Sequence, residues 1–345
     1  MNNNHIQTKK VAVVILNWNG QALMEEFLPS VIAHTPSDLA DIIVADNGST
    51  DQSISMLKEK FPSVGIILLD KNYGFAEGYN QALKQIEHPY TVLLNSDVEV
   101  TPGWLNAPLT AMESDSQIAG VQPKILAQRN KAYFEYAGAA GGFLDRYGYP
   151  YCRGRVLHII EKDHGQYDKE ADLLWATGAC LFIRTNLYKE VGGLDAGFFA
   201  HQEEIDLCWR LRSRGYRLVC TPSSIVYHVG GATLSVESPR KTFLNFRNNL
   251  LMLYKNLPEK ELKHVMRCRF WLDYIAAFKF FLSGHYPNAR AVYEARKAFY
   301  ALKPSYEAVR KENLNKTTLH EIPELRKGSL ICAFYLQGKK KYPQL

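Results

Sequence analysis

The N-terminal part of the chain repeats one pattern, in which a short apolar run ends at a polar or glycine-containing turn and a segment with helical spacing follows. The apolar runs cover residues 11–16, 42–45, 66–69 and 91–94. Continuous runs of this length are typical of strands that are buried on both faces of a sheet. Strands that alternate with helices favour right-handed crossovers and a mostly parallel sheet. The pattern therefore predicts an α/β fold with a central sheet flanked by helices.

Each predicted strand ends at residues that suit a nucleotide ligand. They are Asn17 and Asn19 after the first strand, Asp46 and Asn47 after the second, Asn72, Gly74 and Asn80 after the third, and Asn95 and Asp97 after the fourth. Ligands of parallel sheets bind beyond the carboxyl ends of the strands, so we expect these residues to share one site. Asp97 offers a carboxylate to Mg²⁺ or Mn²⁺, because such cations use one or two carboxylates together with substrate phosphates. For any one Asx residue, a simple turn-forming role is the alternative.

Several classes of protein are disfavoured by the sequence. The chain has no Gly-Lys-Ser or Gly-Lys-Thr phosphate loop, and Gly74 and Gly78 lack the spacing of a dinucleotide-binding loop. The 41 Lys and Arg against 35 Asp and Glu are too few and too dispersed for a nucleic-acid binder, although they suit a phosphorylated donor or an anionic membrane. Six cysteines without metal or disulfide spacing, and a polar start over residues 1–10, indicate a cytoplasmic protein.

Two further segments carry candidate ligands. Small residues at 176–179 interrupt an apolar stretch, which would let a ligand approach the backbone, although a packed bend in a strand is an equal alternative. A Gly-rich aromatic loop at 192–199 then leads to an amphipathic helix that begins near Glu203 and Glu204. Acidic residues at a helix start are ordinarily capping devices. One of them could instead remove a proton from an attacking hydroxyl.

Together these motifs resemble an inverting family two glycosyltransferase of the GT-A fold, near the rhamnosyltransferase-like branch. The resemblance covers about the first 250 residues and rests on segments 14–20, 46–51, 72–80, 94–99 and 198–210, in the family's order. It implies transfer of a hexosyl or deoxyhexosyl unit, with inversion, from a dTDP- or UDP-linked donor to a glycan or lipid-linked acceptor hydroxyl. It also implies a divalent cation on the donor diphosphate and a role in glycan or surface polysaccharide synthesis.

The resemblance implies roles for the residues at the strand ends. Asp46 takes the position of the base or ribose contact, and Asn17, Asn19, Asn47, Asn72, Gly74 and Asn80 are expected to bind the donor around it. Asn95 and Asp97 occupy the first and last positions of the family's Asp-x-Asp motif. Because the first position is Asn, Asp97 would be the principal metal ligand.

Three positions further along the chain are open to two interpretations each. His228, which precedes Gly230 and Gly231, resembles a family histidine that contacts the metal or the diphosphate, but a lone His after a strand is ordinarily a hydrogen-bonded core residue. Arg247 could close over the departing diphosphate or belong to a solvated helix. The family reads Glu-Asp where this chain has Glu203 and Glu204, so Glu204 stands at the position of the base and either glutamate could serve. We expect the nearby Asp206 to orient Arg210 or to cap the helix.

The chain is expected to divide near residue 240. Residues 1–240 would form the GT-A catalytic domain, with a donor-binding half over about 10–100 and an acceptor and base half over about 101–240, and residues 241–345 a mainly helical extension. The apolar run 270–282 is too short to span a bilayer, and a helix packed on the catalytic domain is favoured over one lying on the membrane. The alternative functions are a sugar-nucleotide nucleotidyltransferase and a non-catalytic nucleotide-sugar binding module. A nucleotidyltransferase normally has a basic Gly-rich loop after its first strand, which residues 17–20 lack.

Overall fold

A computed structural model describes residues 9–230 and 238–345 of the chain. Its first four strands are parallel neighbours in the order β4-β1-β2-β3. They are β1 (Val11–Asn17), β2 (Ala40–Asp46), β3 (Gly65–Leu68) and β4 (Tyr90–Leu94). The register pairs Asn17 with Asp46, so both strands end at the same edge of the sheet. The predicted α/β architecture is therefore confirmed, and the strand ends meet as expected.

The crossover helices explain why these strands read as continuous apolar runs. They are α1 (Gln21–His34), α2 (Ser53–Lys60) and α3 (Gly74–Leu83). Along β1, Val11, Val13 and Ile15 pack into one buried cluster, whereas Ala12 and Val14 pack into another. Both faces of the strand are thus covered, which removes the polar alternation of a half-exposed strand.

The remainder of the main sheet is mixed. Its further strands are β5 (Val98–Val100), β6 (Ile118–Ala127), β7 (Asn130–Phe134), β12 (Ala171–Asp172), β13 (Cys180–Arg184) and β14 (Arg217–His228). Strand β13 runs antiparallel between β4 and β6, whereas β14 runs parallel to β6, so the sheet is mixed and the expectation of a mostly parallel sheet holds for β1 to β4 and for the β6–β14 pair. Strand β5 pairs with the end of β14 and places His228 opposite Val98. This pairing brings a residue from late in the chain to the segment that contains Asp97.

A second, smaller sheet and three short helices surround the mixed half. The sheet contains β8 (Gly142–Asp145), β9 (Pro150–Cys152), β10 (Arg155–Val156), β11 (Ile159–Ile160) and β15 (Leu325–Arg326). The helices are α4 (Asn106–Ser114), α5 (Thr185–Glu190) and α6 (Glu203–Ser213), and a 3-10 turn covers Ala196–Phe198. Helix α6 begins with the two glutamates singled out in the sequence, so these lie at a helix start as predicted.

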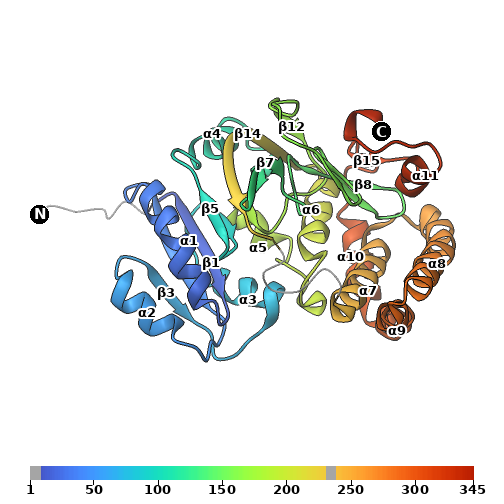
Figure 1. The fold of residues 1–345 in the computed structure, drawn as a ribbon, viewed down its shortest axis with the longest axis horizontal. Helices are drawn as coiled ribbons and strands as arrows, with labels where there is room; N and C mark the ends of the chain where they lie inside the picture. The colour runs from blue at the N-terminus through green and yellow to red at the C-terminus, as the bar shows by residue number, and fades with distance from the viewer. Residues whose placement is uncertain (1–8, 231–237) are drawn as a thin grey trace, which may run out of the picture.

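The C-terminal part consists mainly of helices. They are α7 (Pro239–Asn256), α8 (Glu259–Leu282), α9 (Tyr286–Leu302), α10 (Glu307–Asn315) and α11 (Leu330–Tyr335). Figure 1 shows the parallel half of the sheet at one end of the molecule and these helices at the other, with α8 at the outer edge. Helix α9 packs against both α7 and α8. No helix in the described ranges combines the length and the apolar character needed to cross a bilayer.

Candidate functional site

The ends of β1 and β2 form a rigid polar corner. Asn17 Nδ2 donates to Asp46 Oδ2 at 2.9 Å and to Ser49 Oγ at 3.1 Å, and the Ser49 amide donates to Asp46 Oδ1 at 2.9 Å. The Thr50 amide donates to Asn19 Oδ1 at 2.7 Å, and Asn19 adopts a positive φ of 50°. Hydrogen bonds thus link Asn17, Asn19 and Asp46, three of the residues predicted to bind the sugar-nucleotide donor. The corner lies at the carboxyl edge of the sheet, where Asn17 and Asp46 are both buried.

The neighbouring corner joins β2 to the start of α3. Asn47 Nδ2 donates to Asn72 Oδ1 at 3.2 Å and to the Gly74 carbonyl at 3.0 Å, while the Tyr73 amide donates to Asn47 Oδ1 at 2.9 Å. Gly74 has a φ of +77°, and a Cβ there would lie 2.5 Å from the Phe199 ring. Glycine is therefore required at this position by both the backbone and the space. These contacts bring Asn47, Asn72 and Gly74 together, next to the loop that precedes the two glutamates.

Asp97 and His228 face each other at the end of the fourth strand. Asp97 Oδ1 lies 3.1 Å from His228 Nε2, and Asn95 Nδ2 lies 3.3 Å from the same nitrogen. Glu135 Oε1 lies 3.6 Å from the other ring nitrogen of His228, and the three ionisable side chains are all buried. Burial alone would lower the pKa of His228, but hydrogen bonding and charge from Asp97 and Glu135 raise it to about 10. The carboxylates thus create a site that favours positive charge.

The Asp97–His228 pair fits a divalent cation. The Asp97 carboxylate and the His228 imidazole are both common metal ligands, and they contact each other directly at 3.1 Å, so a cation bound by both would replace the proton between them. Within the described part of the chain, no group of three or more His, Cys, Asp and Glu side chains is arranged to hold a metal ion. A cation here would therefore take its other ligands from water and from donor phosphates, which is the usual way of binding Mg²⁺.

The two glutamates lie at the end of a strained loop. Phe199, His201 and Gln202, just before α6, have positive φ values of 65°, 71° and 74°, which L residues adopt rarely and at a cost. Glu203 is buried and Glu204 is partly buried, and over the described residues neither Oε2 atom has a hydrogen-bond partner. Burial raises the pKa of Glu204 to about 7. Burial and the adjacent Glu204 raise the pKa of Glu203 well above its usual value.

Backbone contacts join the glutamates to the strand ends. The Asn95 amide donates to the Ala179 carbonyl at 3.0 Å, and a side chain placed at Gly178 would begin 3.9 Å from Cβ of Glu204. The first amides of α3, from Phe75 and Ala76, donate to the Phe199 carbonyl at 2.9 and 3.2 Å. The small residues at 176–179 therefore lie between the Asp97 segment and the glutamates. The two regions are neighbours, as the sequence interpretation requires.

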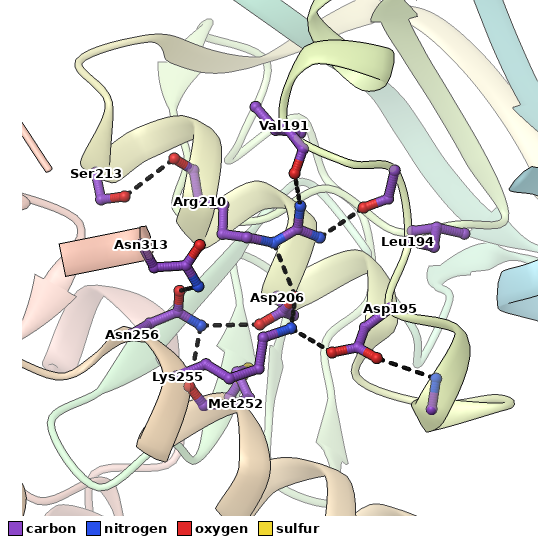
Figure 2. Close-up of polar contacts among 12 residues, drawn as sticks. Val191, Leu194, Asp195, Asp206, Arg210, Ser213, Met252, Lys255, Asn256 and Asn313 are labelled. Atoms are coloured by element: carbon purple, nitrogen blue, oxygen red, sulfur yellow. Dashed lines mark hydrogen bonds and ion pairs between the residues drawn. The ribbon is translucent and has the colours of Figure 1, made fainter. Parts of the chain in front are cut away.

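A buried ionic cluster holds α6 in place. Asp206 accepts from Arg210 Nε at 2.9 Å, from Lys255 Nζ at 2.8 Å and from Asn256 Nδ2 at 2.8 Å (Figure 2). Lys255 also pairs with Asp195 in the preceding loop. Burial alone would raise the pKa of Asp206, but Lys255 and Arg210 hold it below its usual value. The expectation that Asp206 orients Arg210 is confirmed by this contact.

Helix α7 also supports the strained loop from outside. Asn248 Nδ2 lies 2.8–2.9 Å from the carbonyl oxygens of Phe198, Ala200 and His201. Arg247 Nη2 donates to the carbonyls of Gly197 and Phe198 at 2.9 and 3.1 Å. Asn80 is engaged in a similar way, because Nδ2 donates to the Leu194 carbonyl at 2.8 Å and Oδ1 accepts from Tyr188 at 2.7 Å. To bind the sugar-nucleotide donor directly, Arg247 and Asn80 would have to give up these hydrogen bonds and form new ones with the donor.

The comparison with family models decides the classification. The model described as "Glycosyl transferase family 2" matches residues 12–189, which is just over half of the 345-residue chain. The chain belongs to glycosyl transferase family 2. The match spans the ends of β1 to β4 and stops before the two glutamates and His228.

Relatives of this family 2 glycosyltransferase agree in fold and class. An N-acetylglucosaminyl-diphospho-decaprenol L-rhamnosyltransferase from Mycobacterium tuberculosis is 24% identical over 235 residues, which cover 64% of this chain and 76% of the relative. The fold is similar to that of GalNAc-T7 with UDP, GalNAc and Mn²⁺, with a TM-score of 0.56 and 16% identity over 72% of this chain and 48% of that chain. It is also similar to that of the mannosyltransferase PcManGT from Pyrobaculum calidifontis with GDP-Man and Mn²⁺, with a TM-score of 0.52 and 15% identity over 89% of this chain and 84% of that chain. The structural likeness supports the GT-A fold.

Some residues of the glycosyltransferase site were not identified from the sequence. Glu135, beside His228, lies on no motif, and Lys255 acts across 49 residues of chain from its partner Asp206 in α6. His201 is largely buried, its Nε2 has no partner within the described ranges, and burial lowers its pKa to about 4.

Gly231 lies outside the described residues. A cavity of about 230 Å³ lined in part by Trp209 and by Leu314 of α10 includes none of the predicted site residues.

Proposed function

We propose that this enzyme transfers a hexosyl or deoxyhexosyl unit from a nucleotide-diphosphate sugar to an acceptor hydroxyl, with inversion at the anomeric carbon. The observation that carries the proposal is the arrangement of two different acidic centres on either side of the backbone at 176–179. On one side stands the Asp97–His228 pair, which suits a cation. On the other side stand two carboxyl groups with oxygens that have no partner among the described residues.

Glu204 is proposed as the general base. Its pKa of about 7 lets it be ionised in part near neutral pH and still accept a proton effectively. In the reaction, the Glu204 carboxylate takes the proton of the acceptor hydroxyl while the hydroxyl oxygen forms a bond to the anomeric carbon. The bond from that carbon to the diphosphate oxygen breaks, and its electron pair leaves with the diphosphate. Glu203, whose pKa is raised partly by Glu204, remains the alternative base.

The donor and the cation are proposed to bind at the strand ends. Asp97 and His228 would hold Mg²⁺ or Mn²⁺, and a bound cation would neutralise charge on the departing diphosphate. The corner of Asn17, Asn19 and Asp46 would bind the nucleoside of a dTDP- or UDP-linked sugar. The similar structures of GalNAc-T7 with UDP and Mn²⁺ and of PcManGT with GDP-Man and Mn²⁺ support this assignment.

The acceptor is proposed to be a glycan or a lipid-linked saccharide, and the product a glycan or surface polysaccharide. Support comes from the Mycobacterium tuberculosis relative, whose name specifies a diphospho-decaprenol acceptor, and from an O-antigen biosynthesis protein of Myxococcus xanthus that is 25% identical over 234 residues. We place the enzyme in the cytoplasm, at the inner face of the membrane. All six cysteines lie in described segments and are free thiols, which suits a reducing compartment.

A panel of sugar nucleotides tests the proposal. Purified protein would be incubated with each donor and Mn²⁺, and released nucleotide would be measured with and without a chelator. Slow, chelator-sensitive hydrolysis of one or two donors is expected. Donor binding without any nucleotide release would instead favour the non-catalytic binding module, and formation of sugar nucleotide from sugar phosphate and nucleoside triphosphate would favour a nucleotidyltransferase.

A further inference from the structure

The outer face of α8 exposes a line of large apolar side chains. Trp271, Ile275, Phe278 and Leu282 are 68%, 64%, 61% and 69% exposed. Their spacing of four, three and four residues places them on one side of the helix. The inward side of α8 contains the buried Val265, Arg269 and Asp273. An apolar line of this kind on the solvent side is unusual for a surface helix and marks an interaction site.

Helix α9 presents a second line that continues this face. Tyr286, Arg290, Tyr293, Lys297 and Tyr300 follow the same helical spacing, and all five are exposed. The two lines are joined at both ends of the helix pair. Phe281 and Tyr286 have ring centroids 5.2 Å apart, while Phe270 of α8 and Tyr300 of α9 both lie against the Arg296 guanidinium.

The charges on this face have one sign over most of its area. Between residues 262 and 282 the sequence contains a single acidic residue, Asp273. Asp273 is buried and pairs with Arg269 at 2.9 Å and Arg296 at 2.6 Å, so it does not reach the surface. The exposed ionic side chains of that stretch are Lys263, Arg267 and Lys279. On α9, Glu294 lies 3.8 Å from Arg290 and offsets that charge in part.

The charge pattern decides between two occupants. A second copy of the chain docked face to face would bring lysines and arginines together with few carboxylates to pair with them, which is unfavourable. An anionic lipid surface supplies the missing negative charge and also accepts apolar side chains below it. Tyrosine and tryptophan with flanking Lys and Arg are the residues that favour the interface between lipid and water.

We propose that the α8–α9 face, defined by the two exposed lines above with Lys263, Arg267 and Lys279, docks this enzyme on an anionic membrane surface. The inference deepens the proposed function, since it rests on a lipid-linked acceptor for its purpose. The apolar line would enter the headgroup region and the basic residues would contact lipid phosphates. The helices lie in the plane of the interface and do not cross the bilayer.

Vesicle sedimentation of the full chain tests the inference. The protein should sediment with vesicles of phosphatidylcholine and phosphatidylglycerol and remain in the supernatant with phosphatidylcholine alone, and high salt should release it. The double substitution Trp271→Ser with Phe278→Ser should weaken binding at least about 10-fold, because two large apolar groups no longer enter the lipid. Reversal of Arg267 and Lys279 to Glu should remove the preference for anionic lipid. Val309→Ser, at an exposed apolar position of α10, is the matched control and should bind like wild type.

Several outcomes would overturn the inference. They are failure of the wild-type chain to bind anionic vesicles, equal binding by the Trp271/Phe278 variant, and a wild-type dimer that this variant converts to a monomer without any vesicle binding. Circular dichroism would verify that each variant is folded. Hydrolysis of a soluble sugar nucleotide separates this inference from the proposed function, because the Trp271/Phe278 variant should hydrolyse the donor like wild type. If the wild-type protein binds vesicles but does not hydrolyse any donor, the proposed docking surface is supported and the proposed transfer reaction is rejected.

Discussion

The substitution Glu204→Gln should abolish transfer and stabilise the folded protein at the same time. The side chain has an oxygen without a partner in the described structure, and burial raises its pKa from the ordinary 4.5 to about 7. A carboxyl group with a raised pKa in the folded state binds its proton more tightly there than in the unfolded state. Folding stability is therefore lost as pH rises from about 4.5 to about 7, and the loss persists above that range. Glutamine has the shape of the protonated acid and escapes this loss.

The size of the effect follows from the pKa difference. A difference of about 2.5, at about 1.4 kcal/mol for each pKa unit, corresponds to roughly 3 kcal/mol. This value is an upper bound, because Glu203 titrates together with Glu204 and shares the cost. We therefore expect the variant to be up to about 3 kcal/mol more stable than wild type at about pH 8 and equal to it at about pH 4.

Urea denaturation at a series of pH values, followed by tryptophan fluorescence, measures this difference. Donor hydrolysis and transfer rates on the same samples report the base. Wild-type transfer should rise with pH through about 7, because the ionised carboxylate is the active form. Glu204→Asp, which supplies the shorter acid of the family pattern, should retain activity, whereas Glu203→Gln tests the alternative base. The reasoning is refuted if Glu204→Gln has wild-type activity, or if its stability relative to wild type does not change with pH.

Three further predictions concern the cation site, the ionic cluster and the strained loop. Asp97→Ala should lose Mn²⁺ binding in the presence of the donor nucleotide, measured by electron paramagnetic resonance, whereas an unchanged spectrum would reject Asp97 as a ligand. Lys255→Met should lower the free energy of unfolding by about 3–5 kcal/mol, because it leaves the buried Asp206 carboxylate without its main partner. In the same denaturation assay, adding Asp206→Asn should recover part of that loss. Gly74→Ala should lower the free energy of unfolding by at least about 1 kcal/mol, because residue 74 has a positive φ. Collision of the new Cβ with the Phe199 ring should lower it further, and a Phe199→Ala background should remove this second loss. Equal losses in both backgrounds would contradict the contact.

The sequence predicts the donor half of the fold well because the relevant signals are local. Each of the first four strands is a short apolar run that stops at a polar residue, and burial of β1 on both faces accounts for the lack of alternation. Parallel strands end together, so the sequence pattern alone predicts that Asn17 and Asp46 lie side by side, and the register of β1 and β2 confirms it. The position of Asp97 follows from the same rule.

The other half of the site depends on contacts that leave no local pattern. His228 reaches Asp97 because β14 pairs with β5, two strands more than 100 residues apart in the sequence. Glu135 directly follows β7, in a segment without a recognisable motif. Nothing near Lys255 in the sequence indicates that its amino group lies between Asp195 and Asp206. Pairings of this kind are set by the topology of the mixed sheet and by the packing of α7, so they became visible only with the structure.

Helix α7 belongs to the C-terminal extension by its sequence pattern, yet its amide and ammonium groups support the backbone that presents Glu203 and Glu204. A shortened gene that stops at residue 240 would remove Asn248 and Lys255 together. The carbonyls of Phe198, Ala200 and His201 would then lose their shared donor, and the Asp206 carboxylate would lose its ammonium partner. We therefore expect that the shortest fragment able to fold and to catalyse transfer includes α7. The exposed side chains of α8 do not support the loop before α6, so they can change in evolution with the surface that the protein binds.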